Sequence, residues 1–183
     1  MSSLGVLRTG RLLMRPVGWV DLADLQALKA DPIAYAVMLG GVRSAVQTAD
    51  ELAADVRFWG SHGVGMWAVR TVEPDAFVGT VGLHERADGW GISLRFALVR
   101  GAVGRGYASE AAGAAGAALR FAHDQAGVER VVALARESNL GSRQVLGAVG
   151  MVECGAFERD GYRVLVHESV RVSGRQAPDG GRA

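Results

Sequence analysis

The sequence predicts a mixed α/β (α+β) fold with a largely antiparallel sheet of about seven strands. Three β-like runs follow one another at 65–73, 77–85 and 90–100, with only short turn signals between them. Turns this short join antiparallel strands, because a parallel pair needs a much longer crossover. Helical patterns lie before and after these runs, and two further β-like runs close the chain around a turn at 159–161.

The N-terminal part predicts one strand and two helices. The run at 11–17 is typical of a strand. Apolar residues then recur at close to helical spacing over 18–32. A second helix is predicted over 46–60, because Thr48 followed three residues later by Glu51 matches a capping box.

The C-terminal part predicts two helices and three strands. A helix is expected from about Tyr107 to Asp124, followed by a strand rich in β-branched residues at 128–138. A short helix over 140–151 precedes a final hairpin at 151–172. Counting from the first strand, these elements give the seven strands of the predicted sheet.

Length and composition bound the function. The 183 residues, 49% of them hydrophobic and with a net charge of +1, suit one domain over 9–172 and a tail at 173–183 that we expect to be disordered. Scattered basic residues argue against a nucleic-acid partner. A single cysteine and four histidines without short ligand spacing predict neither a disulfide nor a metal site. No run approaches the roughly 18–20 apolar residues of a membrane span, so a cytoplasmic protein is expected.

A glycine-rich stretch separates the third β-like run from the next helix. Residues 103–115 are VGRGYASEAAGAA. Backbone N–H groups at a strand-to-helix turn lack intrahelical partners and lie at the positive end of the helix dipole, so they bind phosphate groups. Glycine lets a phosphate approach without meeting a Cβ. The stretch therefore predicts a pyrophosphate cradle made by Gly104, Arg105, Gly106, Tyr107, Ala108 and Ser109.

Other interpretations fit the same stretch. Ala111, Ala112 and Ala115 would let the helix pack closely on the sheet, or keep it slim beneath a long ligand. The range 104–109 also matches G-x-G-x-x-small, a dinucleotide fingerprint that belongs in a parallel βαβ unit. A P-loop is excluded, because no Lys-Ser or Lys-Thr pair follows the glycines.

Two motifs resemble the GNAT superfamily of acyl-CoA-dependent N-acetyltransferases. VGRGYASEA resembles the pyrophosphate motif Q/R-x-x-G-x-G/A, with Gly106 and Ala108 in the last two positions and Val103 in place of Gln or Arg. Its form G-x-G-Y-A-x-E-A is shared by the RimJ/RimL-like branch, the ribosomal-protein acetyltransferases. Downstream, NLGSRQVLGAVGM is similar to the second motif, N-x-x-S-x-x-(apolar)-x-x-x-G-(F/M), and GRLLMRPV is similar to the first strand of the family.

The resemblance implies a GNAT fold, with helices on both faces of a twisted sheet and two central strands that splay apart. Here those strands would be 92–100 and 129–137. The pantetheine of acetyl-CoA would lie between them, held by backbone groups at Leu98 and Val99. Asn139 and Ser142 would face acetyl-CoA near the thioester or pantetheine.

The implied activity is direct attack of a neutral primary amine on the thioester, the amine being a protein N-terminus or a small molecule. Ser142 matches the general acid of RimL-like members, and Tyr162 is the alternative. A glutamate of many relatives is missing, because Ser93–Phe96 reads SLRF. His84 and Glu85, at the end of the preceding run, are therefore the candidates for the base.

Several points stay open at this stage. Tyr35, Trp59 and Trp67 could wall an acceptor pocket or belong to the core, and acceptor loops are expected at 30–47 and in the last hairpin. Cys154 is expected to be buried in a packing role. A homodimer is one expected assembly, since the last strands often make dimer contacts in relatives. The functional alternatives are a non-catalytic acyl-CoA-binding module and a nucleotide-binding oxidoreductase with a parallel sheet.

Overall fold

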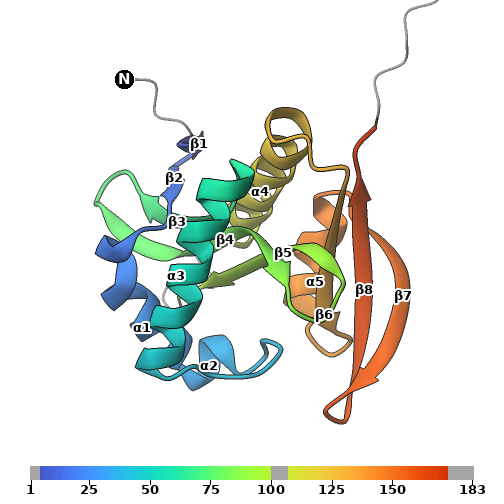
Figure 1. The fold of residues 1–183 in the computed structure, drawn as a ribbon. Coiled ribbons are helices and arrows are strands. Elements are labelled where there is room, and N and C mark those ends of the chain that lie inside the picture. The colour runs from blue at the N-terminus through green and yellow to red at the C-terminus, as the bar shows by residue number, and fades with distance from the viewer. Residues whose placement is uncertain (1–4, 100–106, 173–183) are drawn as a thin grey trace, which may run out of the picture.

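The central sheet confirms the predicted fold class. The computed structural model describes residues 5–99 and 107–172 and contains an eight-stranded sheet in the order β1-β2-β3-β4-β5-β6-β8-β7 (Figure 1). Neighbouring strands are antiparallel except β5 and β6, which are parallel. The strands are β1 (Leu7–Thr9), β2 (Leu12–Pro16), β3 (Met66–Thr71), β4 (Ala76–Arg86), β5 (Gly91–Leu98), β6 (Arg130–Arg136), β7 (Val152–Arg159) and β8 (Tyr162–Val170). The strand that was not predicted is β1. A mostly antiparallel sheet contradicts the oxidoreductase alternative.

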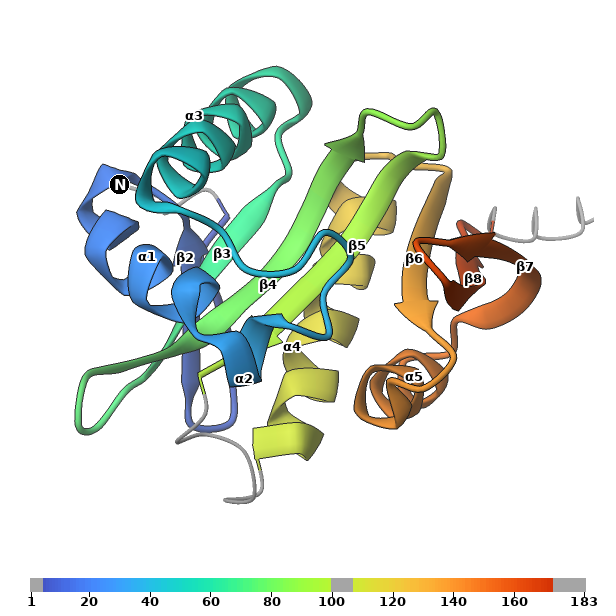
Figure 2. The same ribbon diagram turned by 90° about the horizontal axis from the view of Figure 1, so that it is seen from below.

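Helices cover both faces of the sheet (Figure 2). One face carries α1 (Leu22–Ala30), α2 (Pro32–Tyr35) and α3 (Ala45–His62), with a 3-10 turn at Trp19–Asp21 before them. The other face carries α4 (Tyr107–Arg120), its π-helical continuation Phe121–Gln125, and α5 (Leu140–Ala148). The segment between α2 and α3 passes over β4 and β5 in Figure 2, which brings it to the centre of the sheet.

Helix α3 begins at Ala45, one residue before the predicted range, and its N-cap lies four residues before the predicted one. Ser44 is its N-cap: the Ser44 hydroxyl accepts the N–H of Gln47 at 3.2 Å, and the Gln47 side chain accepts the N–H of Ser44 at 2.9 Å. The capping box predicted at Thr48 and Glu51 is therefore wrong. The Thr48 hydroxyl donates to the Ser44 carbonyl, and Glu51 is turned toward cations of other elements. This frees Glu51 for the site described below.

Small residues let α4 pack closely on the sheet. Ala111, Ala114, Ala115, Ala118 and Ala122 are all at most 5% exposed and belong to or flank the main core. The packing interpretation of the alanine-rich stretch is thus confirmed for Ala111 and Ala115, whereas Ala112 is only half-buried.

The tryptophans at 59 and 67 belong to the core and not to a pocket wall. The Trp67 ring is fully buried and meets Trp59 edge to face, with centroids 4.8 Å apart. Phe121 completes this aromatic group, 5.6 Å from Trp67. The packing role expected for Cys154 is wrong, because Cys154 is exposed. It lies on β7, an edge strand whose residues are exposed on both faces apart from the half-buried Phe157.

Candidate functional site

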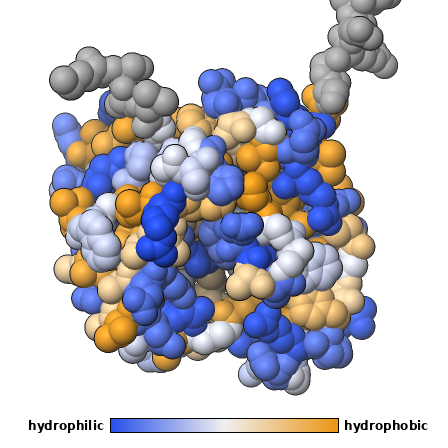
Figure 3. All heavy atoms as spheres, in the orientation of Figure 1, coloured by the Kyte–Doolittle hydropathy of each residue, from blue (hydrophilic) through white to orange (hydrophobic). Residues whose placement is uncertain are grey.

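A cavity of about 910 Å³ lies on the face of the sheet that carries α1 to α3. Its walls come from α3, the segment after α2, the ends of β4 and β6, the middle of β5 and the start of α5. Figure 3 shows a hollow near the middle of this face, with hydrophilic residues around much of its rim. Both predicted acceptor segments reach the cavity, through Tyr35, Met38 and Arg43 and through Arg159 of the last hairpin.

Strands β5 and β6 part beside this cavity. They are paired at Ser93 and Val132, and beyond this bridge β5 continues to Leu98 while β6 continues to Arg136. In Figure 2 the two ribbons diverge toward α5. This is the splay that the family resemblance implied, between the two strands for which it was expected.

Backbone groups of β5 face the opening between the strands. The Val99 N–H donates to the Val78 carbonyl of β4 at 3.0 Å. Successive residues of an antiparallel strand direct their backbone groups to alternate sides, so those of Leu98 are directed away from β4, toward β6. Of the two residues expected to hold pantetheine, Leu98 is the one with backbone groups on the open side. Gly79, opposite Leu98, has a φ of +151°, and a Cβ there would lie 2.2 Å from the Ala97 carbonyl oxygen.

The expected pyrophosphate cradle is only partly within the described residues. Gly104, Arg105 and Gly106 lie outside them. Tyr107, Ala108 and Ser109 form the first turn of α4, where backbone N–H groups have no partner within the helix. The positive end of the α4 dipole therefore lies just after the end of β5, where an anionic group is stabilised.

The start of α5 brings Asn139 and Ser142 to the cavity wall. Asn139 is the N-cap of α5, and its Oδ1 accepts the N–H of Ser142 at 3.1 Å. Both side chains line the cavity. The Ser142 hydroxyl has no hydrogen-bond partner among the described residues, so it is available to a ligand. Asn139 therefore has a local structural role as well as a place at the site.

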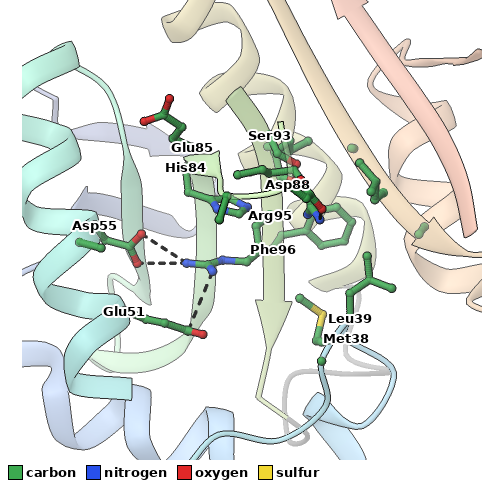
Figure 4. A pocket seen from close by; sticks show the side chains of 18 of the residues that line it. Met38, Leu39, Glu51, Asp55, His84, Glu85, Asp88, Ser93, Arg95 and Phe96 are labelled. Carbon is green, nitrogen blue, oxygen red and sulfur yellow. Dashed lines mark hydrogen bonds and ion pairs between the residues drawn. The ribbon is translucent and has the colours of Figure 1, made fainter. Parts of the chain in front are cut away.

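Of the two candidates for the base, the structure directs His84 into the cavity. His84 pairs with Ser93 across β4 and β5, and its ring lies beside Arg95 in Figure 4. Glu85, the next residue along the strand, is exposed, and its carboxylate points away from both side chains (Figure 4). Burial, with Arg95 and Arg86 adding to it, lowers the pKa of His84 to about 3. His84 is therefore a neutral imidazole at pH 7.

A buried network of charges lies under the same side of the cavity. Arg95 donates to Asp55 at 3.0 Å and lies 4.0 Å from Glu51 (Figure 4). Glu51 also accepts from Lys29 and Arg43, each at 2.6 Å. Burial alone would raise the pKa of Glu51, but these three cations outweigh it and hold that pKa at about 2. The negative charges of this wall are thus neutralised within the protein.

The opposite wall carries an arginine without a carboxylate partner among the described residues. Arg136 ends β6 and lines the cavity. Its guanidinium lies over the ring of Tyr162, 3.9 Å from the ring centroid, and its one hydrogen bond, to the Met38 carbonyl, is long at 3.5 Å. Sequence reasoning singled out neither Arg136 nor Arg95. The available signal was an arginine within or at the end of an otherwise apolar strand.

Within residues 5–99 and 107–172, no group of three or more His, Cys, Asp or Glu residues could hold a metal ion. In those same two segments, no helix combines the length and apolar character needed to cross a membrane.

Comparisons with known proteins agree with this geometry. A putative GNAT-family acetyltransferase from Bordetella pertussis is 25% identical, with a TM-score of 0.77 over 89% of this chain and 98% of its own. A ribosomal-protein-S5-alanine acetyltransferase from Vibrio fischeri is 13% identical (TM-score 0.74, covering 91% and 96%). A variant of a spermidine N-acetyltransferase from Vibrio cholerae is also 13% identical (TM-score 0.69, covering 89% and 95%). At 13% identity these last two share the fold alone.

A search of curated proteins gave no significant match. The model of the acetyltransferase (GNAT) domain matches residues 11–152, which is most of the chain. The parted central strands, the helix that starts beside them and this match lead to one conclusion: the chain belongs to the GNAT acetyltransferases, which transfer an acetyl group to an amine.

Proposed function

We propose that the protein transfers the acetyl group of acetyl-CoA directly to a primary amine while both substrates are bound. The observation that carries this proposal is the meeting of two features at one cavity. The gap between β5 and β6 opens onto it, and the same cavity is lined by His84, Asn139 and Ser142. A donor in the gap would therefore reach the cavity that carries the candidate acid and base.

The residues around the gap suit acetyl-CoA. The backbone groups of Leu98 would bind pantetheine, the first turn of α4 together with Gly104, Arg105 and Gly106 would bind the pyrophosphate, and the Asn139 amide would face the pantetheine. When bound, acetyl-CoA supplies a thioester carbonyl carbon that accepts a nucleophile. Holding the amine beside that carbon lowers the barrier by several kcal/mol, because the two reactants have already lost their translational and rotational entropy on binding.

Ser142 and His84 have complementary roles in the transfer. The amine nitrogen bonds to the carbonyl carbon, the carbon–sulfur bond breaks, and its electron pair leaves on sulfur. The Ser142 hydroxyl donates a proton to that sulfur and is reprotonated by solvent, and the solvent also receives the proton that His84 takes from the nitrogen, so that in net one proton passes from the amine to the thiol. The nitrogen becomes far more acidic once it is bonded to the carbonyl carbon, so the neutral His84 ring takes its proton even with a pKa of about 3.

This role for His84 favours an acceptor that is already neutral when it binds. A base with a low pKa cannot remove the proton of a lysine-like ammonium, whose reference pKa is about 10.4. An α-amine has a reference pKa of about 7.7–8.0, so a substantial fraction is neutral at cellular pH. The proposal therefore favours α-amines over lysine side chains.

Binding of the donor is tested first. The thermal unfolding of the protein is measured with acetyl-CoA, CoA, NADH and ATP. A ligand at about 100 times its Kd stabilises the protein by roughly 2.7 kcal/mol, and we expect this from acetyl-CoA and CoA. Stabilisation by NADH alone, or by none of the four, would overturn the proposal.

Transfer is tested second, by mass spectrometry of a panel of primary amines incubated with acetyl-CoA. We expect Ser142→Ala to reduce kcat about 10²-fold without changing the Kd of CoA. Ser138→Ala is the matched control, because Ser138 lies four residues before Ser142, is exposed and does not line the cavity. Binding of CoA without acetylation of any amine would instead support a non-catalytic acyl-CoA-binding module.

A further inference from the structure

The charges of the cavity favour an acceptor that carries an anion. Among the described residues, six arginines and four carboxylates line it. Asp88 pairs with Arg86 and Arg159, and Glu51 and Asp55 pair with the cations of their own wall. The remaining carboxylate, Glu85, points away from the centre (Figure 4). Within the described residues, therefore, each carboxylate at the cavity is either paired or turned away from the centre, and no unpaired carboxylate faces the centre to bind a polyamine.

Two of the six arginines have no carboxylate partner among the described residues, and they differ in position. Arg57 is exposed at the rim on α3, where water solvates its charge. Arg136 is half-buried between Tyr162 and the segment after α2, and its Nε is buried without a hydrogen-bond partner. A buried donor that lacks a partner is costly to the protein. Arg136 is thus a partly buried cation at the cavity that lacks a carboxylate partner in the described part of the chain.

The position of Arg136 places a ligand group relative to the reaction. Arg136 lies three residues before Asn139 and six before Ser142, on the same wall of the cavity. A guanidinium forms two parallel hydrogen bonds with a carboxylate, a geometry that a single amine or an amide does not match. The Tyr162 ring covers one face of the guanidinium and so restricts its orientation.

We infer that Arg136 binds a carboxylate of the acceptor, and that the acceptor is a small amino carboxylate. This inference rests on the proposed acetyl transfer and names its substrate class. The amine would lie toward His84 and Ser142 while the carboxylate is held at the end of β6. The carboxylate of a free amino carboxylate raises the pKa of its own amine, and pairing that carboxylate with Arg136 offsets this effect, so that the bound amine can be neutral. The arrangement selects against spermidine-like polycations, which bring further positive charge to a wall that already presents an unpaired arginine.

The test uses acceptors that differ in the anionic group, and their kcat/KM values are compared per neutral amine, because the carboxylate also raises the pKa of the amine. Alanine, phenylalanine and β-alanine are each compared with their carboxamides and with the amines that lack the carboxyl group, and spermidine is included. We expect kcat/KM to be about 10- to 100-fold higher for the best amino carboxylate than for its carboxamide, as for loss of a hydrogen bond to a charged group. A carboxamide, simple amine or spermidine that reacts as well or better would overturn the inference.

Variants locate the effect. Arg136→Gln should abolish the preference for the carboxylate and leave the KM of acetyl-CoA unchanged, whereas Arg136→Lys should retain part of it. Arg57→Gln is the matched control, because it removes the same charge from the rim of the same cavity. If both glutamine variants lose the preference for the carboxylate equally, the preference comes from the overall positive charge of the cavity, and the inferred role of Arg136 is wrong. A raised KM for acetyl-CoA in Arg136→Gln would assign Arg136 to the donor and also overturn it.

A binding measurement separates this inference from the proposed function. Calorimetry is run with the CoA-bound protein and an amino carboxylate, where no transfer takes place. Binding that is lost in Arg136→Gln supports the inference even if no product forms in the kinetic assay. Absence of binding by every amino carboxylate, in a protein that acetylates other amines, overturns the inference and leaves the acetyl transfer standing.

Discussion

The two long walls of the cavity use charge in opposite ways. The α3–β5 wall contains Glu51, Asp55 and Arg95, and each of these charges has an opposite charge within 4.0 Å. The β6–α5 wall contains Arg136, Asn139 and Ser142; its guanidinium has no carboxylate partner in the described chain, and its serine hydroxyl is unbonded there. We conclude that the paired charges of the first wall serve the folded structure, whereas the unpaired polar groups of the second wall are available to a ligand.

Substitutions in the two walls should therefore affect different properties of the protein. Substitutions in the α3–β5 wall should cost stability first, because removing one partner leaves a buried charge. Substitutions in the β6–α5 wall should cost activity or specificity first, because the ligand, and not the protein, completes its interactions. Variants at four positions test this difference between the walls, beginning with the one expected to have the largest effect.

Arg95→Met should have the largest effect. It leaves Asp55 buried beside Glu51 without its main partner, and breaking a buried pair costs about 3–5 kcal/mol. Urea unfolding of Arg95→Met measures this cost, and Arg95→Met combined with Asp55→Leu should recover much of it, since no unpaired charge then remains. If the single variant is as stable as the unmodified protein, the paired wall is not structural and the comparison fails.

The pH dependence of stability tests His84, which lies on β4 beside Arg95 of the same wall. Unfolded His84 binds a proton near pH 6.5, but folded His84 does not until about pH 3. The unfolded state therefore binds more protons between these values, and stability falls as the pH falls through that window, by at most about 1.4 kcal/mol per pH unit.

Urea unfolding from pH 7 to pH 5 measures this slope, and His84→Gln should reduce it. Some slope should persist, because burial also lowers the pKa of His167. An unchanged slope in His84→Gln would show that the imidazole is not held neutral by the fold, which would remove the reason for favouring α-amine acceptors.

Asn139→Ala should have a smaller effect on stability and a distinct effect on activity. It removes the N-cap of α5, which costs about 1 kcal/mol, and it frees the turn that positions Ser142. Asn139→Asp keeps the cap and serves as the control in thermal unfolding and in the acetylation assay. If Asn139→Ala lowers the free energy of unfolding by roughly 3 kcal/mol or more, as expected for the other wall, the two walls do not differ in their contribution to stability.

Tyr162→Leu should have the smallest effect. The ring is 45% exposed, and a cation–π contact in such a place is worth about 0.5–1 kcal/mol. Loss of the ring should therefore raise the KM of an amino carboxylate about two- to fivefold and leave protein stability nearly unchanged. A large fall in kcat with no change in KM would instead assign Tyr162 to proton transfer, the alternative raised by its place in the sequence.

The sequence was most informative where local patterns decide the structure. The three central strands, the helices and the final hairpin follow from periodicity and turn residues, and Ser142, Asn139 and His84 were selected by motif or by strand position. The N-cap of α3 was misplaced because two possible capping pairs follow one another, at 44/47 and 48/51, and the pair at Ser44 and Gln47 is the one formed. Cys154 was misplaced because nothing local shows that β7 is an edge strand.

The charged walls could not have been predicted from local patterns. Arg95 and Asp55 are 40 positions apart, and Arg136 meets Met38 across 98 positions. Such pairs depend on which strands the chain places side by side. His84 and Glu85 were both candidates in the sequence, and the pleat of β4, which directs neighbouring residues to opposite faces, separates them.

The single bridge between Ser93 and Val132 also has a mechanical consequence. It divides the sheet into two leaves, β1 to β5 and β6 to β8, that are joined along only a short seam. A cosubstrate bound between these two parts of the sheet would contact both and so restrict their motion relative to each other. We expect amide hydrogen exchange in β5 and β6 to slow together when CoA binds and to recover together when it departs, so that release of the product and loosening of the sheet are one event with one rate.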